Sequence, residues 1–105
     1  MSHETILETA SRRREAFRNL EKNLQTIKKT AKKLDPHAEV YLFGSTAEKK
    51  HTYSSDIDIL IITKKPPAEV LYKLWKAGIK DPFETHIQPP EKLPFYQTKS
   101  KLIKA

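Results

Sequence analysis

The stretch Leu42–Ile62 reads LFGSTAEKKHTYSSDIDILII, and it decides which fold this sequence can adopt. It holds Gly44, one of two glycines in the chain, and the pair Asp56 and Asp58. The aspartates open an apolar run that predicts a buried β-strand. Because alternate residues of a strand point to the same face, the two carboxylates should lie side by side. The opposite face should carry the isoleucines toward the core: Ile57, Ile59 and Ile61.

Paired carboxylates at the entrance of a buried strand indicate a cation site. Two adjacent carboxylates repel each other, and burying them unpaired is costly. A divalent cation resolves both problems. Mg²⁺ is commonly held by one or two carboxylates together with substrate phosphates and water, as in phosphoryl and nucleotidyl transfer.

The dipeptide Gly44-Ser45 supplies a complementary half of such a site. Gly44 follows a predicted strand and opens a short predicted helix, so backbone N–H groups there can meet a phosphate at the helix N-terminus. Glycine allows close approach to the backbone, and the Ser45 hydroxyl adds a donor. Together the two motifs predict a site for a triphosphate and Mg²⁺.

Periodicity predicts the other elements around this stretch. An amphipathic helix, continuous or broken near residues 11–14, fills most of residues 1–34 and ends at Asp35-Pro36. Further strands are predicted over 38–43 and 82–88, beside the one over 56–63, and helices over 45–50 and 67–77. This order predicts an α/β (α+β) domain, with a small mixed sheet of three or more strands flanked by helices and a long N-terminal helix.

Apolar residues in the C-terminal half of the chain predict which faces of its elements are buried. The helix over 67–77 should bury a stripe that includes Leu71, Leu74 and Trp75, and Tyr72 is also expected in the core. Gly78 is predicted as its C-cap, with Ile79 folding back as the hydrophobic partner. After the third strand, three residues are expected to cover the sheet: Leu93, Phe95 and Tyr96.

Composition bounds the class of protein. The 105 residues predict a single domain, with its α/β core over residues 38–96. The absence of cysteine excludes disulfides and thiol chemistry, and no apolar stretch has the length of a membrane helix, so a cytoplasmic location is expected. A formal charge of +7 fits attraction of nucleotides, nucleic acid or an acidic partner protein. It fits equally a solvated, lysine-rich surface such as a thermophile's.

The motifs resemble those of a known family. Gly44-Ser45, a ten-residue spacer, and Asp56-x-Asp58 before an apolar strand are similar to the signature of the DNA polymerase β-like nucleotidyltransferases. The short chain looks most like the minimal nucleotidyltransferases. The resemblance implies the polymerase β-like fold, an NTP substrate and two Mg²⁺ sites. It implies Asp56 and Asp58 as metal ligands and Gly44 and Ser45 as triphosphate binders, and it places Ser55 in the family's frequent Ser-Asp-x-Asp.

The family also uses a third carboxylate on a neighbouring strand. Here the third strand reads FETHI, and Glu84 and His86 share one face of it. Glu84 is the predicted ligand, since hard cations prefer oxygen, although the family usually has Asp. His86 fits three roles: a general base, a substrate contact or a polar neighbour. Lys49 is a candidate contact to the γ-phosphate, with Lys50 or His51 as alternatives, against the reading that these side chains are simply solvated.

Two functions from different classes follow from these residues and the resemblance. The first is an enzyme that transfers a nucleoside monophosphate, AMP from ATP, to a hydroxyl of another macromolecule. The short chain leaves little room for an acceptor domain, so a partner protein is expected, which the resemblance identifies as a HEPN-domain protein from an adjacent gene. The second is an antitoxin module that binds nucleotide and masks such a partner without efficient catalysis. A homo-oligomer through the N-terminal helix is a further expectation. A small RNA-binding domain is disfavoured, because basic and aromatic residues do not alternate on a predicted sheet face.

Overall fold

The computed structural model describes residues 18–44, 57–80 and 83–105. In chain order the elements are α2 (Leu20–Leu34), β1 (Glu39–Phe43), β2 (Ile57–Ile62), α4 (Pro67–Lys76), β3 (Phe83–Gln88), the 3₁₀ turn η1 (Pro90–Lys92), α5 (Leu93–Lys99) and β4 (Ile103–Lys104). The predicted strands and the helix after the double proline are therefore confirmed within one or two residues at the ends that can be compared. The first part of the N-terminal helix and the helix expected over 45–50 lie outside the described residues.

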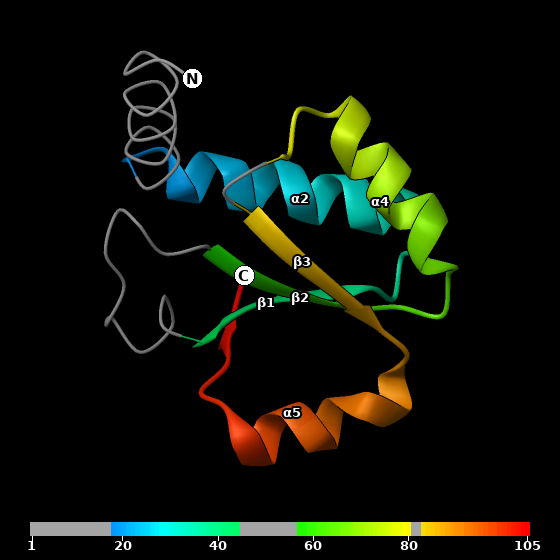
Figure 1. Cartoon of the computed structure of the whole chain (residues 1–105). Coiled ribbons are helices and arrows are strands. Elements are labelled where there is room, and N and C mark those ends of the chain that lie inside the picture. The colour runs from blue at the N-terminus through cyan, green and yellow to red at the C-terminus, as the bar shows by residue number, and fades with distance from the viewer. Residues whose placement is uncertain (1–17, 45–56, 81–82) are drawn as a thin grey trace, which may run out of the picture.

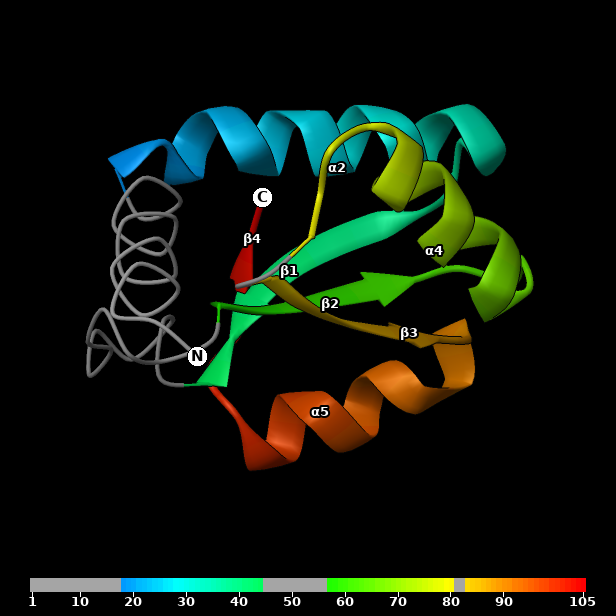
Figure 2. The same ribbon diagram turned by 45° about the horizontal axis from the view of Figure 1, so that its top comes forward.

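The four strands form one mixed sheet in the order β3-β2-β1-β4. The β1 strand is antiparallel to both β2 and β4, whereas β2 and β3 are parallel. Helices α2 and α4 cover one face of this sheet, and α5 lies against the other (Figures 1 and 2). This arrangement confirms the predicted α/β class with a small mixed sheet between helices. Within the described ranges, no helix is long and apolar enough to cross a lipid bilayer.

The central strand β2 is apolar on both faces because both faces are covered. Ile57, Ile59 and Ile61 are fully buried in the larger core cluster, together with residues of α2 and α4. Leu60 and Ile62 point to the other face, where residues of α5 pack on them. The predicted direction of the three isoleucines is confirmed. The smaller cluster lies on the face that also carries Asp58, so α5 borders the candidate site.

Helix α4 begins and ends as its sequence predicts. Pro67 occupies the first turn, where its missing N–H leaves no hydrogen bond unmade. At the other end Gly78 has a φ of +92°. The Gly78 N–H donates to the Trp75 carbonyl at 3.0 Å, and the Ile79 N–H donates to the Leu74 carbonyl at 2.9 Å. These two bonds form a Schellman cap, and Ile79 is buried beside it, as expected.

The predicted core face of α4 is wrong for three of its residues. The helix is anchored by Val70 and Leu74, which are both about 1% exposed and pack toward α2. Trp75 is 65% exposed, Tyr72 59% and Leu71 41%. Val70 and Leu74 are four residues apart and share one helix face. Leu71 and Trp75 lie beside that face and line a pocket with residues of the edge strand β3, whereas Tyr72 lies on the opposite side of the helix. The expectation that Trp75 and Tyr72 belong to the core is therefore corrected.

Two further differences concern the C-terminal segment. Leu93 and Tyr96 pack against the sheet as predicted, but Phe95 is 54% exposed because it lies about 100° around α5 from Tyr96. The strand β4 was not predicted. It has only two residues, Ile103 and Lys104, which are too few to produce an alternating pattern.

A buried threonine joins the C-terminal end of α2 to the end of β2. The Thr63 hydroxyl donates to Asp35 Oδ2 at 2.6 Å, and the His37 N–H donates to Oδ1 at 2.9 Å. These bonds hold the pKa of Asp35 below its usual value of 3.8, with the Thr63 bond as the largest cause. Ionised Asp35 is thus favoured by folding.

The variant Asp35→Asn should therefore be less stable than the wild type in a pH-dependent way. Because the folded pKa is depressed, the stabilisation is fully present above the unfolded pKa and disappears as pH falls through the lower folded pKa. Urea midpoints of both proteins, measured from pH 7 down to pH 2, should differ most at neutral pH and converge in acid. A difference that stays constant across this range would contradict the role of the Asp35 carboxylate.

Candidate active site

The pairing of β2 with β3 brings two carboxylates from different strands together. In the parallel register Asp58 lies opposite Glu84, and Leu60 lies opposite His86. Neighbouring strands are about 4.8 Å apart, so residues in register on the same face are in contact range. Asp58, Glu84 and His86 each offer one ligand atom, and these atoms all lie within 4.8 Å of one another. The sequence-predicted third carboxylate therefore lies beside the second.

The imidazole of His86 stands between the two carboxylates. Its Nε2 atom is 3.4 Å from Glu84 Oε1 and 3.8 Å from Asp58 Oδ1. The same Nε2 is buried and, among the described residues, has no hydrogen-bond partner. Leaving a buried polar atom unsatisfied costs about 1–3 kcal/mol, so the atom faces a position where a missing partner would bind.

Aromatic residues hold the His86 ring in place. The rings of Phe43 and His86 meet edge to face, with centroids 4.9 Å apart, and Phe43 makes a similar contact with Tyr96 at 5.7 Å. Phe43 is itself paired with Asp58 in the β1–β2 register. The wall of the site thus comes from β1 and α5, and sequence reasoning did not assign Phe43 or Tyr96 to it. The aromatic residue directly before Gly44 was the available signal for Phe43.

Position 44 must be glycine because a side chain there would collide with the Asp58 carboxylate, apart from any need for space around a phosphate. Its φ is +69°, a backbone conformation that favours glycine. A Cβ atom at this position would lie 2.5 Å from Asp58 Oδ2 and 3.3 Å from Asp58 Cγ, well inside van der Waals contact. The end of β1 is therefore shaped so that the Asp58 carboxylate can occupy the space beside the backbone.

This donor set fits the divalent cation that the sequence motif implies. Two ligands bound at about 2.1 Å to one octahedral ion lie about 3.0 Å apart when adjacent and about 4.2 Å when opposite. The His86 distances to Glu84 and Asp58, 3.4 and 3.8 Å, fall between these values. The other Asp58 oxygen, Oδ2, lies beside the side-chain-free backbone of Gly44, and Nε2 has no hydrogen-bond partner among the described residues.

Four of the predicted site residues lie outside the described part of the chain. They are Ser45, Lys49, Ser55 and Asp56. Their assignment to triphosphate or metal binding stays a prediction. The described site residues, Gly44, Asp58, Glu84 and His86, are brought together at one end of the sheet by the β1–β2 and β2–β3 registers.

Comparison with known proteins identifies the family. The model of the nucleotidyltransferase domain matches residues 24–105, which include every described residue of this site. The chain belongs to the nucleotidyltransferase domain family. A crystal structure assigned as a nucleotidyltransferase superposes on this nucleotidyltransferase with a TM-score of 0.64 and 28% identity, covering 78% of this chain and 96% of the other. The resemblance to the minimal nucleotidyltransferases is confirmed.

A second crystal structure shows the same fold. It is a protein of Sulfolobus solfataricus, also assigned as a nucleotidyltransferase, with a TM-score of 0.59 and 22% identity. The superposition covers 91% of this chain and 85% of that one. A comparison of this sequence with curated proteins found no match. The family supports nucleotidyl transfer as the general chemistry, and it leaves the acceptor and the nucleotide base to be proposed from the site.

Proposed function

We propose that this nucleotidyltransferase uses divalent cations, Mg²⁺ in the first place, to transfer AMP from ATP to a hydroxyl group of a partner protein. The observation that carries the proposal is the β2–β3 register, which sets Glu84 directly beside Asp58. A carboxylate pair drawn from two strands, with a buried and unsatisfied nitrogen between them, supports an ion-dependent reaction rather than a solvated surface.

The reaction forms a bond between the acceptor oxygen and the α-phosphorus of ATP. The bond from that phosphorus to the bridging oxygen of the β-phosphate breaks, pyrophosphate leaves, and the hydroxyl proton passes to solvent or a nearby base. Bound cations would supply charge neutralisation on the triphosphate and a lower pKa of the acceptor hydroxyl. Asp58 and Glu84, with Asp56, would fix the ions, because carboxylates on neighbouring strands present rigid oxygen ligands.

The end of β1 would bind the triphosphate. Gly44 has no side chain, so the Asp58 carboxylate lies against its backbone, and a phosphate bound to the same cation would lie close to the end of β1. In this proposal the Ser45 hydroxyl and Lys49 contact the phosphates, and Ser55 positions the loop before Asp56. These three roles rest on the motif and its spacing.

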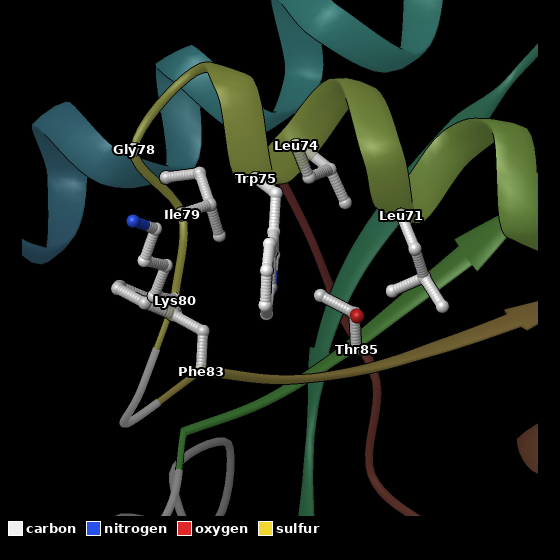
Figure 3. A pocket seen from close by; sticks show the side chains of 8 residues that line it. All are labelled: Leu71, Leu74, Trp75, Gly78, Ile79, Lys80, Phe83 and Thr85. Carbon is white, nitrogen blue, oxygen red and sulfur yellow. The ribbon is translucent and has the colours of Figure 1, made fainter.

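The exposed aromatic residues of α4 support a partner protein. Leu71, Trp75, Phe83 and Thr85 line a pocket of about 410 Å³ between α4 and the edge strand β3 (Figure 3). Exposed apolar patches of this kind mark protein–protein contacts. Lys76 lies over the Tyr72 ring at 5.2 Å, and Lys80 lies over the Trp75 ring at 5.7 Å, which gives the patch a basic rim.

The proposed partner would reach both the pocket and the site. Alternate residues of β3 point to opposite faces of the sheet. Phe83 and Thr85 line the pocket, whereas Glu84 and His86 face the carboxylate site. An acidic segment lying along the outer edge of β3 would therefore pass close to both. The first candidate is the HEPN-domain protein that the family resemblance suggests. A homo-oligomer through the N-terminal helix stays a prediction from the sequence.

Trp75→Ala should weaken binding of the acceptor protein by about thirtyfold or more. A central interface tryptophan contributes at least about 2 kcal/mol, which corresponds to that factor in Kd. The folded domain should tolerate the change, since Trp75 is 65% exposed. The matched control is Phe95→Ala, which removes a 54% exposed aromatic residue from α5 on the other side of the sheet. Calorimetry that finds equal losses for both variants would contradict the α4 surface.

A binding module without efficient catalysis is the second candidate. As an antitoxin it would bind nucleotide and mask its partner, and the same α4 patch would carry the contact. The two candidates differ in covalent chemistry. The enzyme leaves a nucleoside monophosphate on the partner, whereas the masking module inhibits the partner stoichiometrically and leaves it unmodified.

The deciding experiment mixes the protein with Mg²⁺, the product of the adjacent gene and each of the four NTPs labelled at the α-phosphate. The proposal predicts labelled partner protein with ATP in particular. The phosphoester should be stable to denaturation and carried on a hydroxyl side chain, as identified by mass spectrometry. A stable complex with no labelled partner under any of the four NTPs would reject the enzyme in favour of the masking module.

A further inference from the structure

We propose that His86 is itself a ligand of the cation held by Glu84 and Asp58, binding it through Nε2. The nitrogen ligand would make this position favour a first-row transition-metal ion such as Mn²⁺ over Mg²⁺. The inference rests on the proposed function, because it concerns the same ion. It adds a nitrogen to a site whose family pattern consists of carboxylates, and it replaces the three roles that the sequence left open for His86.

The position of Nε2 separates these roles. A merely polar neighbour would complete a hydrogen bond, but Nε2 is buried and has no hydrogen-bond partner among the described residues. A general base or substrate contact would face the approaching acceptor. Here Nε2 instead faces the oxygens of Glu84 and Asp58, at 3.4 and 3.8 Å. An atom placed between two anionic oxygens, with no hydrogen-bond partner among the described residues, lies where a third ligand of a cation would lie.

The surroundings of the ring restrict it to this orientation. Phe43 contacts the imidazole edge to face, and Leu60, which is fully buried, is its register neighbour on β2. Tyr96 of α5 in turn contacts the Phe43 ring edge to face. Aromatic and apolar residues therefore border the ring on these sides, and its Nε2 faces the carboxylates of Glu84 and Asp58. Glu84 and His86 are two residues apart on one strand, so both reach the same face without rearrangement.

The nature of the donor determines the selectivity. Mg²⁺ is a hard ion that prefers oxygen and keeps several waters, whereas imidazole suits Fe²⁺, Ni²⁺, Cu²⁺ and Zn²⁺, and Mn²⁺ stands at the weak end of the same first-row series. Replacing His86 by asparagine substitutes an amide for the imidazole at similar reach. The loss should therefore fall mainly on Mn²⁺. Because removal of an outer partner of a metal ligand already costs about ten- to a hundredfold in affinity, loss of a direct ligand should weaken Mn²⁺ at least tenfold.

The test is pulsed electron paramagnetic resonance of the wild-type protein with Mn²⁺ and no nucleotide, since adenine nitrogens would also couple to the ion. We expect modulation from a directly bound ¹⁴N nucleus, which changes to the ¹⁵N pattern when only histidine is ¹⁵N-labelled. This isotope exchange needs no substitution and so does not depend on a variant folding. In His86→Asn the nitrogen signal should be lost, and the ratio of Mn²⁺ to Mg²⁺ affinity should fall about tenfold.

The control is His37→Asn, which changes an exposed histidine in the turn after α2 and should keep the signal. Bound Mn²⁺ without histidine coupling, or coupling that persists in His86→Asn, would overturn the inference. Nucleotidyl transfer with Mg²⁺ is assayed separately. Transfer without nitrogen coupling would reject only the role of His86, and nitrogen coupling without transfer would reject only the proposed function.

Discussion

Replacing Asp58 by asparagine is expected to lower nucleotidyl transfer about a thousandfold or more while the fold is preserved. The carboxylate lies where β1, β2 and β3 meet, opposite Phe43 on one strand and Glu84 on the other. Metal ions contribute several kcal/mol of charge stabilisation to such transition states, and about 4 kcal/mol corresponds to a thousandfold in rate. Asparagine has the same shape but lacks the charge that would hold the ion.

Two further variants make this result specific. Glu84→Gln removes the second carboxylate of the pair and should also abolish most of the transfer. Glu91→Gln removes an exposed carboxylate from η1 and should leave the rate unchanged. Initial rates at saturating ATP, with melting curves for each protein, provide the measurement. Full activity in Asp58→Asn, with the melting temperature unchanged, would show that the ion is bound elsewhere.

Replacing Gly44 by alanine is expected to damage both the fold and the site. Alanine at a positive φ costs about 1–2 kcal/mol. In addition its Cβ would lie 2.5 Å from Asp58 Oδ2, so the carboxylate must move. A displacement of about 1 Å in a catalytic group can cost about a hundredfold in rate. We therefore expect a hundredfold loss of transfer and weaker metal binding, measured by calorimetry with Mn²⁺.

The second glycine provides the matched control. Gly78 also has a positive φ, +92°, but a Cβ there would meet no atom within 4 Å. Gly78→Ala should therefore show only the backbone cost, seen as a melting temperature lowered by about 4 °C or more, with Mn²⁺ binding unchanged. If both alanine variants lose stability equally and both retain activity, the close approach of Gly44 to Asp58 is not needed for activity, which would contradict this prediction.

The local features of the fold could be predicted from the sequence because they depend on neighbouring residues. The alternation of Ile57, Ile59 and Ile61 determined which face of β2 enters the larger core. The Schellman cap at Gly78 followed from the glycine and the apolar residue after it. Glu84 was singled out because it is the carboxylate on the third strand, and the structure places it beside Asp58.

The features that depend on strand register and helix placement could not be predicted in this way. Both Val70–Leu74 and Leu71–Trp75 are pairs four residues apart, and only the position of α2 decides that the first pair is buried. The approach of Gly44 to Asp58 depends on the pairing of Phe43 with Asp58, which no local pattern encodes. For the same reason, sequence alone could not place His86 between the two carboxylates.

The most direct test of the central claim compares ATP labelled at the α-phosphate with ATP labelled at the γ-phosphate, in parallel reactions with Mg²⁺ and the partner protein. A nucleotidyltransferase with Asp58 and Glu84 as its ion ligands transfers the α-label to the partner and releases the γ-label in pyrophosphate. The α-label should disappear from the partner when Asp58→Asn replaces the wild type. Transfer of the γ-label, or α-label transfer that is equal in wild type and Asp58→Asn, would contradict the proposed chemistry.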